Sequence, residues 1–144
     1  MTQRYSYQTE QGKNGRFITI LQESLCQMSR SLAVTVSLAE ESCGREAEKL
    51  NRILTEDRAD STYLHGLLKE NGGVPLSCEQ LTLSLTRLEG LRQSIERQLT
   101  LADLYGQLAD LSEQAHQEAT FRKLAGKKQN AALWLLYLYT LNKK

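Results

Sequence analysis

The stretch Thr55–Pro75 reads TEDRADSTYLHGLLKENGGVP. Its apolar residues recur at helical spacing until the Asn-Gly-Gly of residues 71–73. Glycine can take the left-handed conformation that ends a helix, and the proline that follows prevents the helix from continuing. Two aspartates, Asp57 and Asp60, stand three residues apart in the middle of the stretch, which places both carboxylates on one helix face. The segment therefore predicts the end of a helix that carries two acidic groups.

The same spacing of apolar residues continues along almost the whole chain, which is typical of amphipathic helices. We expect a first helix from Phe17 to a break at residues 43–44, and a second from there to the glycines at 72–73. No segment alternates apolar and polar residues over the length of a strand, so we expect no sheet. With 144 residues, the chain is long enough for one domain with a single core.

Two capping-box spacings position the remaining helices. Ser77 is followed three residues later by Gln80, which predicts that the third helix begins at Ser77 and presents an apolar face from Leu81 onward. Asp110 and Glu113 repeat the spacing, so a fourth helix is expected to start near there and to run to about Leu141. Four long helices with apolar stripes form an all-α bundle over residues 16–144, which we expect to follow a flexible tail at residues 1–15.

The two halves of the chain also resemble each other. A shift of 71 residues places apolar positions of the second helix on those of the fourth: Leu50 on Phe121, Ile53 on Leu124, Leu64 on Leu135 and Leu67 on Leu138. The match is consistent with two helical hairpins related by a pseudo-twofold axis, and also with a chance agreement of two amphipathic helices.

Charge and cysteine content limit the classes of function. The net charge of +1 and the lack of a long basic run argue against nucleic-acid binding, which depends on clustered Lys and Arg. The three cysteines, Cys26, Cys43 and Cys78, have no CxxC spacing. We therefore expect them to be small packing residues of a cytoplasmic protein, neither a zinc site nor a redox pair. The first residues contain no apolar core of a signal peptide.

The most apolar run is Ala131–Tyr139, near the C-terminus. A membrane-spanning helix needs about 20 residues, so this run predicts a buried helix end or a contact surface. It is apolar all round, although a helix at the edge of a bundle needs only one apolar stripe. We expect Trp134, Tyr137 and Leu141 to form an outward face that pairs two copies of the chain as a homodimer. The alternative is that the N-terminal tail folds over this face.

The helix with the two aspartates resembles the ferritin-like superfamily, in particular the bacterioferritin and rubrerythrin families. Those families carry Glu-x-x-His on a helix that ends, about a dozen residues later, at a glycine closely followed by proline. The frame here is Ile53-Leu54-x-x-Asp57-x-x-Asp60-x-x-x-Leu64, then Gly73-Val74-Pro75, and the fourth helix repeats it as Phe121-x-x-Leu124-Ala125-x-x-Lys128-x-x-Ala131. The resemblance covers residues 17–142. It implies a ferritin-like antiparallel four-helix bundle with a crossover between two helical hairpins.

The resemblance also implies where a di-metal centre would lie. The family takes one carboxylate from each of two helices and Glu-x-x-His from the other two. Here Asp57 and Asp60 stand in place of the first Glu and His, and Lys128 and Ala131 in place of the second pair; a register slip of one residue would instead place Lys127 and Asn130 there.

The first and third helices would supply the remaining carboxylates of such a centre, and Glu23 and Glu96 are nearest to the expected level. A lysine ammonium has no lone pair to give a metal. Lys128 beside carboxylates would instead replace the charge of the metal with a buried ion pair.

Three interpretations remain open. The first is a non-catalytic ferritin-like bundle that has lost its di-metal centre and acts through binding or assembly, with no catalytic, cofactor-binding or metal-ligating residues. The alternative is a divergent di-iron or di-manganese carboxylate protein that uses Glu23, Asp57, Asp60 and Glu96. The third is an unrelated helical bundle that serves as an adaptor.

Other candidate sites are weaker. Glu113-Gln-Ala-His116 is a literal Glu-x-x-His, but it lies fifteen residues before Lys128, or about 22 Å along a helix. It would therefore sit at one end of the bundle. His65 is a lone histidine that we expect to be packed or half-exposed. The sequence has no Gly-rich phosphate loop, no HExxH and no nucleophile elbow.

Overall fold

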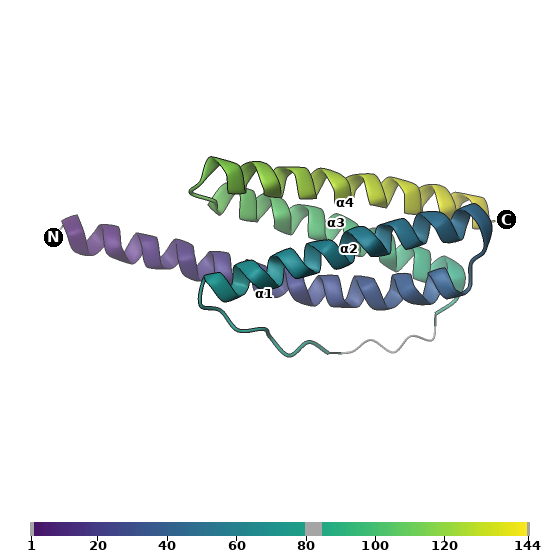
Figure 1. Ribbon diagram of the computed structural model, residues 1–144, viewed down its shortest axis with the longest axis horizontal. Coiled ribbons are helices and arrows are strands. Elements are labelled where there is room, and N and C mark those ends of the chain that lie inside the picture. The colour runs from purple at the N-terminus through teal and green to yellow at the C-terminus, as the bar shows by residue number, and fades with distance from the viewer. Residues whose placement is uncertain (1, 80–84, 144) are drawn as a thin grey trace.

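The computed structural model describes residues 2–79 and 85–143, with side chains from Gly12 onward. It contains four helices, drawn in Figure 1: α1 (Thr2–Glu40), α2 (Gly44–Glu70), α3 (Arg87–Leu111) and α4 (Ala115–Asn142). They pack side by side, and no strand occurs among the described residues. The predicted all-α four-helix bundle is therefore confirmed.

Contacts between the helices give the topology. Thr35 lies against Ser94 and Ser31 against Gln98, so α1 and α3 run in opposite directions. Glu46 near the start of α2 meets Asn142 at the end of α4, so these two helices are also antiparallel. The chain returns from the end of α2 to the start of α3 by a crossover, residues 71–86, whose two ends lie at opposite ends of the bundle (Figure 1). This is the predicted crossover between two hairpins.

The crossover explains why α3 begins later than predicted. It starts at Arg87, where Thr86 caps it by accepting a hydrogen bond from the Glu89 backbone N–H at 3.2 Å. The predicted start at Ser77 is wrong, and its partner Gln80 and the expected apolar position Leu81 lie outside the described residues.

Chain length accounts for this difference. A 25-residue α3 is about 37 Å long, and the six residues that a start at Ser77 would leave reach only about 20 Å when fully extended.

The fourth helix starts near the predicted position and ends near Leu141 as expected, but its start does not use the predicted capping box. Asp110 belongs to the last turn of α3, and α4 begins at Ala115 after a short connection. The capping box expected at residues 110–113 is therefore wrong. At the other end of the sequence, α1 continues as a helix without a break from Thr2 and projects beyond the other helices (Figure 1). The flexibility of residues 1–15 and a domain boundary near residue 16 stay predictions.

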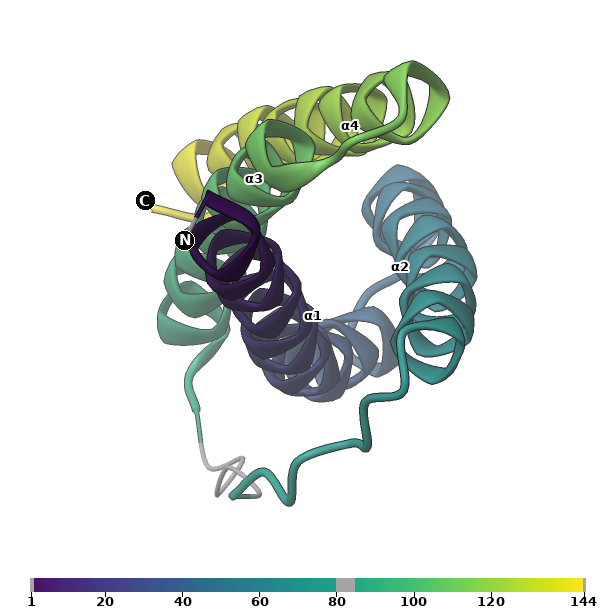
Figure 2. The ribbon, with the colours of Figure 1, turned by 90° about the vertical axis from the view of Figure 1, so that its left-hand side faces the viewer.

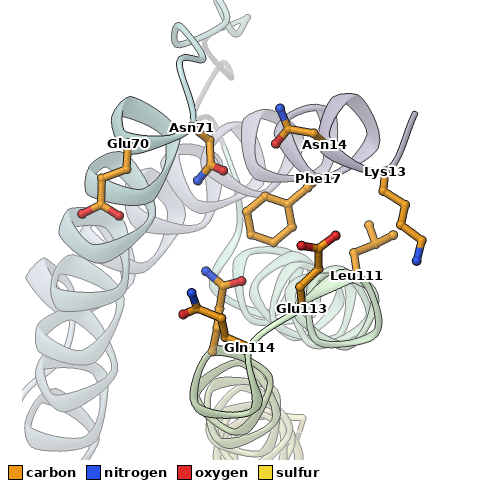
Figure 3. Close-up of a pocket in the computed structure, with 9 residues that line it drawn as sticks. Lys13, Asn14, Phe17, Glu70, Asn71, Leu111, Glu113 and Gln114 are labelled. Atoms are coloured by element: carbon orange, nitrogen blue, oxygen red, sulfur yellow. The ribbon is translucent and has the colours of Figure 1, made fainter. Parts of the chain in front are cut away.

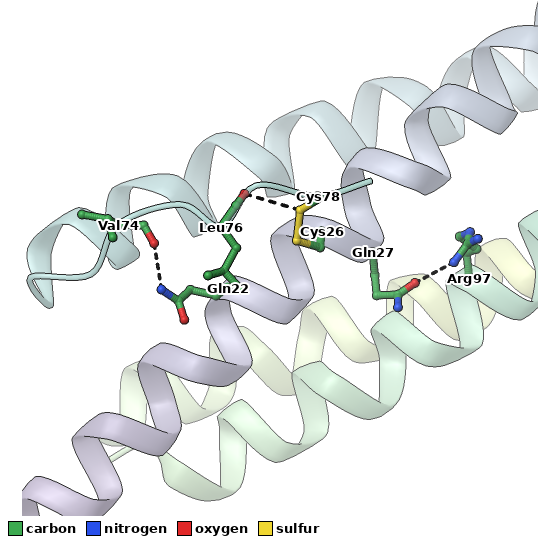
Figure 4. Close-up of a disulfide and its surroundings, with 7 residues drawn as sticks. All are labelled: Gln22, Cys26, Gln27, Val74, Leu76, Cys78 and Arg97. Atoms are coloured by element: carbon green, nitrogen blue, oxygen red, sulfur yellow. Dashed lines mark hydrogen bonds between the residues drawn. A yellow bond between two sulfur atoms is a disulfide. The ribbon is translucent and has the colours of Figure 1, made fainter. Parts of the chain in front are cut away.

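A disulfide joins Cys26 on α1 to Cys78 in the crossover, with the two Cα atoms 5.6 Å apart (Figure 4). The expectation that these cysteines are separate thiols is therefore wrong, while Cys43 is free and exposed. Close by, Gln22 Nε2 donates a hydrogen bond to the Val74 carbonyl at 2.8 Å, which also holds the crossover against α1. The pair is 52 residues apart in sequence, so its proximity depends on the path of the crossover.

The core has two apolar parts. The larger part lies toward the α3–α4 turn and gathers around Phe121, whose ring centroid is 6.1 Å from that of Phe17 and 6.3 Å from that of Tyr105. The smaller part lies toward the other end and includes Leu50, Leu91 and Leu135. Buried polar residues separate the two parts, as described below. Within the part of the chain that the structure describes, none of the helices has an apolar stretch that would span a lipid bilayer.

Candidate functional site

The ammonium group of Lys128 lies in the middle of the bundle, fully buried. It forms an ion pair and hydrogen bond with Asp57 Oδ1, and the side chains of both residues have 0% exposure. A second ion pair joins Lys128 Nζ to Asp60 Oδ2 at 3.0 Å, although no hydrogen bond forms at that oxygen. The ion pair expected from the sequence is therefore present, with one cation between two carboxylates.

All four helices contribute to this level of the bundle. Asp57 Oδ2 accepts a hydrogen bond from Gln98 Nε2 of α3 at 2.9 Å. The same amide nitrogen lies 3.2 Å from Ser31 Oγ of α1. We call Ser31, Asp57, Asp60, Gln98 and Lys128 the polar layer. It connects the two hairpins through charge and hydrogen bonds at the point where the two apolar parts of the core meet.

Helical spacing explains why charged side chains enter the core here. Asp57 follows Ile53 by four residues and precedes Leu64 by seven, so it shares their buried face of α2. Lys128 falls between Leu124 and Ala131 on the buried stripe of α4 in the same way. Asp57 and Lys128 could be separated only if α2 or α4 rotated about its own axis, which would expose the apolar stripe of that helix. The apolar stripes therefore force the charges to pair inside the bundle.

The pKa shifts describe how the layer holds its charge. Burial raises the pKa of the Asp60 carboxyl, and the nearby Lys128 ammonium offsets only part of that effect. Burial alone would lower the pKa of Lys128, but the attraction of Asp57 and Asp60 outweighs it and the pKa is raised. The ammonium is thus stabilised as a cation, whereas ionised Asp60 is the costly member of the layer.

Tyr105 of α3 also faces the two aspartates. It is fully buried, and its hydroxyl has no hydrogen-bond partner among the described residues. Burial, followed by the charges of Asp60 and Asp57, raises the pKa of this phenol well above its ordinary value. Tyr105 therefore stays protonated at neutral pH, so it adds no charge to the layer.

The two glutamates expected at the site do not reach it. Glu23 is exposed on α1, and Glu96 is exposed on α3, where it pairs with Arg92 at 2.8 Å. Both have the charge and the approximate level of a metal ligand, but neither lies on the buried stripe of its helix. Ser31 and Gln98 occupy the corresponding inward positions. That prediction is wrong.

A signal for the missed residues is present in the sequence. The buried positions Leu91, Ser94, Gln98 and Leu101 follow one another at spacings of three and four on α3. A polar residue inside an apolar stripe is a marker of a buried polar contact, because burying it without a partner is costly. The apolar stripe of α3, and not its charged residues, therefore indicates Gln98.

The other sequence candidates lie elsewhere. Lys128 occupies the layer, and the alternative Lys127 is exposed, so the helix register follows the frame without a slip. Glu113 and His116 are exposed beside the α3–α4 turn, at one end of the bundle as expected. Glu113 borders an open polar cavity of about 570 Å³ there (Figure 3). His65 is exposed on α2, not packed.

The residues of the polar layer do not fit a di-metal centre. Two carboxylates come from α2, whereas α1 supplies a hydroxyl, α3 an amide and α4 an ammonium. Both carboxylates direct an oxygen to Lys128 Nζ, and an ammonium repels a metal cation and offers it no lone pair. Among the described residues, no group of three or more His, Cys, Asp or Glu side chains is arranged to hold a metal ion.

Comparison with known proteins identifies the fold. No protein-family model matches the chain, and no curated protein does either. Among solved structures, a ferritin-like, diiron-carboxylate protein from Bacillus anthracis str. Ames matches with a TM-score of 0.75 and 15% sequence identity, over 88% of this chain and 97% of that one. Dps from Thermosynechococcus elongatus matches with a TM-score of 0.66 and 11% identity, over 92% and 94%. The chain therefore has the ferritin-like fold.

Replacing Lys128 tests how the layer supports the fold. We expect Lys128→Met to lower the free energy of unfolding by about 3–5 kcal/mol, because the buried Asp57 loses its counter-ion. The measurement is urea denaturation followed by circular dichroism. The exposed neighbour gives a matched control, since Lys127→Met should change stability by no more than about 0.5 kcal/mol. Equal stability of the two variants would contradict the structural role of the ion pair.

Asp60 gives a test by pH. A carboxyl whose pKa is raised by folding binds its proton more tightly in the folded state than in the unfolded state. Its contribution to the free energy of unfolding is therefore complete below the unfolded pKa of 3.8, and it is lost as the pH rises through the folded pKa. We expect Asp60→Asn to reduce this loss between pH 4 and 7 in urea unfolding curves. Asp103→Asn, at an exposed position of α3, is the control. Identical pH profiles for wild type and Asp60→Asn would contradict the prediction.

Proposed function

We propose that this protein is a ferritin-like bundle that works without a di-metal centre and acts through binding or assembly, not catalysis. The observation that supports it most directly is the Lys128 ammonium between Asp57 and Asp60. This side chain supplies the positive charge that a carboxylate pair in a buried site requires. The two carboxylates then have a structural role.

The polar layer is also a poor starting point for metal chemistry. A divalent ion would have to displace an ammonium whose pKa is raised by the same two carboxylates. It would then find an amide and a hydroxyl in place of the carboxylates of a di-metal centre. The alternative of a divergent di-iron or di-manganese protein depended on Glu23 and Glu96, and both side chains are exposed away from the layer.

Assembly is supported by one face of α4. We call Leu133, Trp134, Leu136, Tyr137 and Leu141 the α4 apolar face; their exposed fractions lie between 38% and 65%. An exposed cluster of this kind is typical of a protein contact surface, and aromatic residues with polar tips are enriched there.

We propose that a second copy of the chain covers the α4 apolar face and forms a homodimer. The alternative cover, the N-terminal segment, is part of the helix α1 and projects from the end of the molecule opposite the C-terminus (Figure 1). An isologous contact between two α4 helices would bury the cluster on both chains at once.

The expected environment and partners follow the same proposal. With a net charge of +1, we propose no role in nucleic-acid binding. A cytoplasmic location also stays a proposal. The Cys26–Cys78 disulfide fits it only where the bond forms transiently, because stable disulfides are usual in oxidising compartments.

Metal content tests the absence of a di-metal centre. We expect protein purified without chelators, and then incubated with Fe²⁺ or Mn²⁺ and desalted, to retain far less than one ion per chain by elemental analysis. The physical reason is that the Lys128 ammonium already lies between the two carboxylates, where it repels a metal cation. A stoichiometry of about two ions per chain would support the di-metal alternative instead.

Light scattering behind a sizing column tests the dimer. At about 10 µM, a scale at which ordinary protein dimers form, we expect a mass twice the 16.3 kDa of one chain. Trp134→Glu should give monomers with unchanged helicity, because a carboxylate would be desolvated in the contact but can meet Lys49 within the chain. Leu76→Glu, in the exposed crossover, is the matched control and should remain dimeric. A wild type that stays monomeric on concentration would refute the dimer.

A further inference from the structure

A disulfide fixes the crossover against the middle of α1. Figure 4 shows the bond between Cys26 of α1 and Cys78 of the crossover, whose Cα atoms are 5.6 Å apart. Four residues before Cys78, the Val74 carbonyl accepts a hydrogen bond from Gln22 Nε2 at 2.8 Å. Gln22 and Cys26 are one helical turn apart, so both contacts lie on one face of α1. In the described part of residues 71–86, no other hydrogen bond joins the crossover to α1.

The described part of the crossover contributes little to the core. Both apolar parts of the core consist of residues of the four helices. Val74 and Leu76 of the crossover are 69% and 53% exposed. Closer packing occurs only at its two ends: Gly73 passes so close to Leu68 of α2 that a side chain would not fit, and Leu85 is half-buried before α3. Opening the disulfide would therefore leave the core of the bundle intact.

The crossover is longer than the distance that it has to span. Its sixteen residues, 71–86, reach about 54 Å when fully extended, whereas the 25-residue α3, which separates the two ends of the bundle, is about 37 Å long. The disulfide holds one point of this slack chain against α1. Without the bond, the chain length allows Cys78 to move away from α1 while α2 and α3 stay in place.

The bond can be reached by a thiol from solution. Cys26 and Cys78 are both half-buried, and partly exposed disulfides are reduced more easily than buried ones. The third cysteine, Cys43, is exposed, but it lies beyond the end of α1, whose last residue Glu40 is about 21 Å from Cys26 along the helix. Cys43 is therefore too far away to attack the bond within the same chain, and the reductant has to come from outside.

We propose that the Cys26–Cys78 bond is a reversible redox switch that determines whether the crossover lies against α1. The thiolate of a dithiol reductant attacks one sulfur, forms a mixed disulfide and releases the other cysteine, which takes up a proton. The second thiol of the reductant then attacks the mixed disulfide and releases the second cysteine as a thiol. The protein gains two electrons and two protons, and the reductant leaves as its own disulfide.

The switch controls access to one face of α1. In the oxidised protein the crossover covers the half-buried side chains of Gln22 and Cys26. Reduction leaves only the hydrogen bond from Gln22 to hold the crossover there, and a single hydrogen bond at the protein surface adds little stability. The crossover then moves away and this face of α1 becomes accessible, whereas oxidation covers it again.

Alkylation followed by mass spectrometry tests whether the bond is reversible. In the Cys43→Ser chain, which lacks the free thiol, N-ethylmaleimide should label no cysteine at first and both Cys26 and Cys78 after dithiothreitol, without denaturant. Replacing dithiothreitol with oxidised glutathione should close the bond and abolish the labelling. Circular dichroism should show the same helicity in both states, because the core is not involved. A bond that opens only in denaturant, or helicity that is lost on reduction, would overturn the proposal.

Limited proteolysis tests whether the crossover is released. A protease that cuts after glutamate can attack Glu79, which is exposed next to Cys78. We expect cleavage there to be on the order of ten-fold faster after reduction, because a segment that is free of its helix opens more readily for the protease. Glu41 and Glu113, exposed in the two short connections, are internal controls and should be cut at the same rate in both states. Equal cleavage at Glu79 in both states would contradict the switch.

The variant Cys78→Ser tests the switch without a reductant. It should be cut after Glu79 as fast as the reduced wild type, with or without dithiothreitol. We expect its melting temperature to be about 10 °C below that of the oxidised wild type, because the cross-link between residues 52 apart no longer constrains the unfolded chain. Cys43→Ser is the matched control and should retain the slow cleavage and the melting temperature of the oxidised wild type. Slow cleavage of Cys78→Ser would show that the crossover stays in place without the bond, and the proposal would be wrong.

Discussion

The ion pair between Lys128 and Asp57 is the constraint on which the rest of the bundle depends. Both side chains are fully buried, so neither can keep its charge unless the other stays in place. The two positions are 71 residues apart, which is also the shift that aligns apolar positions of the second and fourth helices in the sequence. Opposite charges from the two hairpins thus meet at the centre. Such a pair fixes the register of α2 against α4, because a shift by one turn would separate the charges.

The parts of the fold that follow from local pattern could be predicted from the sequence. The stripe around Ile53 and Leu64 gave the face of α2 and thus the burial of Asp57, and the stripe of α4 gave Lys128 by the same reasoning. Features that depend on distance in space could not be predicted in this way. The Cys26–Cys78 disulfide and the late start of α3 are two of them, because both follow from the path of the crossover along α1.

The two glutamates that the sequence placed at the site show a further limit of prediction from local pattern. Glu23 and Glu96 have the chemistry that a metal site needs, but their helical phase turns them to solvent. Gln98 lacks that chemistry and is buried against Asp57. In a bundle, the angular position of a residue around its helix axis determines whether its side chain reaches the centre. The chemistry of the side chain determines only which bonds it can form once it is there. The site could therefore be predicted from α2 and α4, where charged residues lie on the buried stripe of the helix. It could not be predicted from α1 and α3, where the glutamates lie off that stripe.

Because the core holds an ion pair, the binding or assembly that we propose would take place at the surface of the bundle, on the α4 apolar face. Trp134 packs over Lys49, so the α4 apolar face borders the α2–α4 contact. The α1–α3 contact lies on the other side of the ring of helices in Figure 2, so a second chain on the α4 apolar face would not cover it. The polar layer touches all four helices and includes Lys128 of α4, so it fixes the position of α4, and with it the α4 apolar face, relative to the other helices.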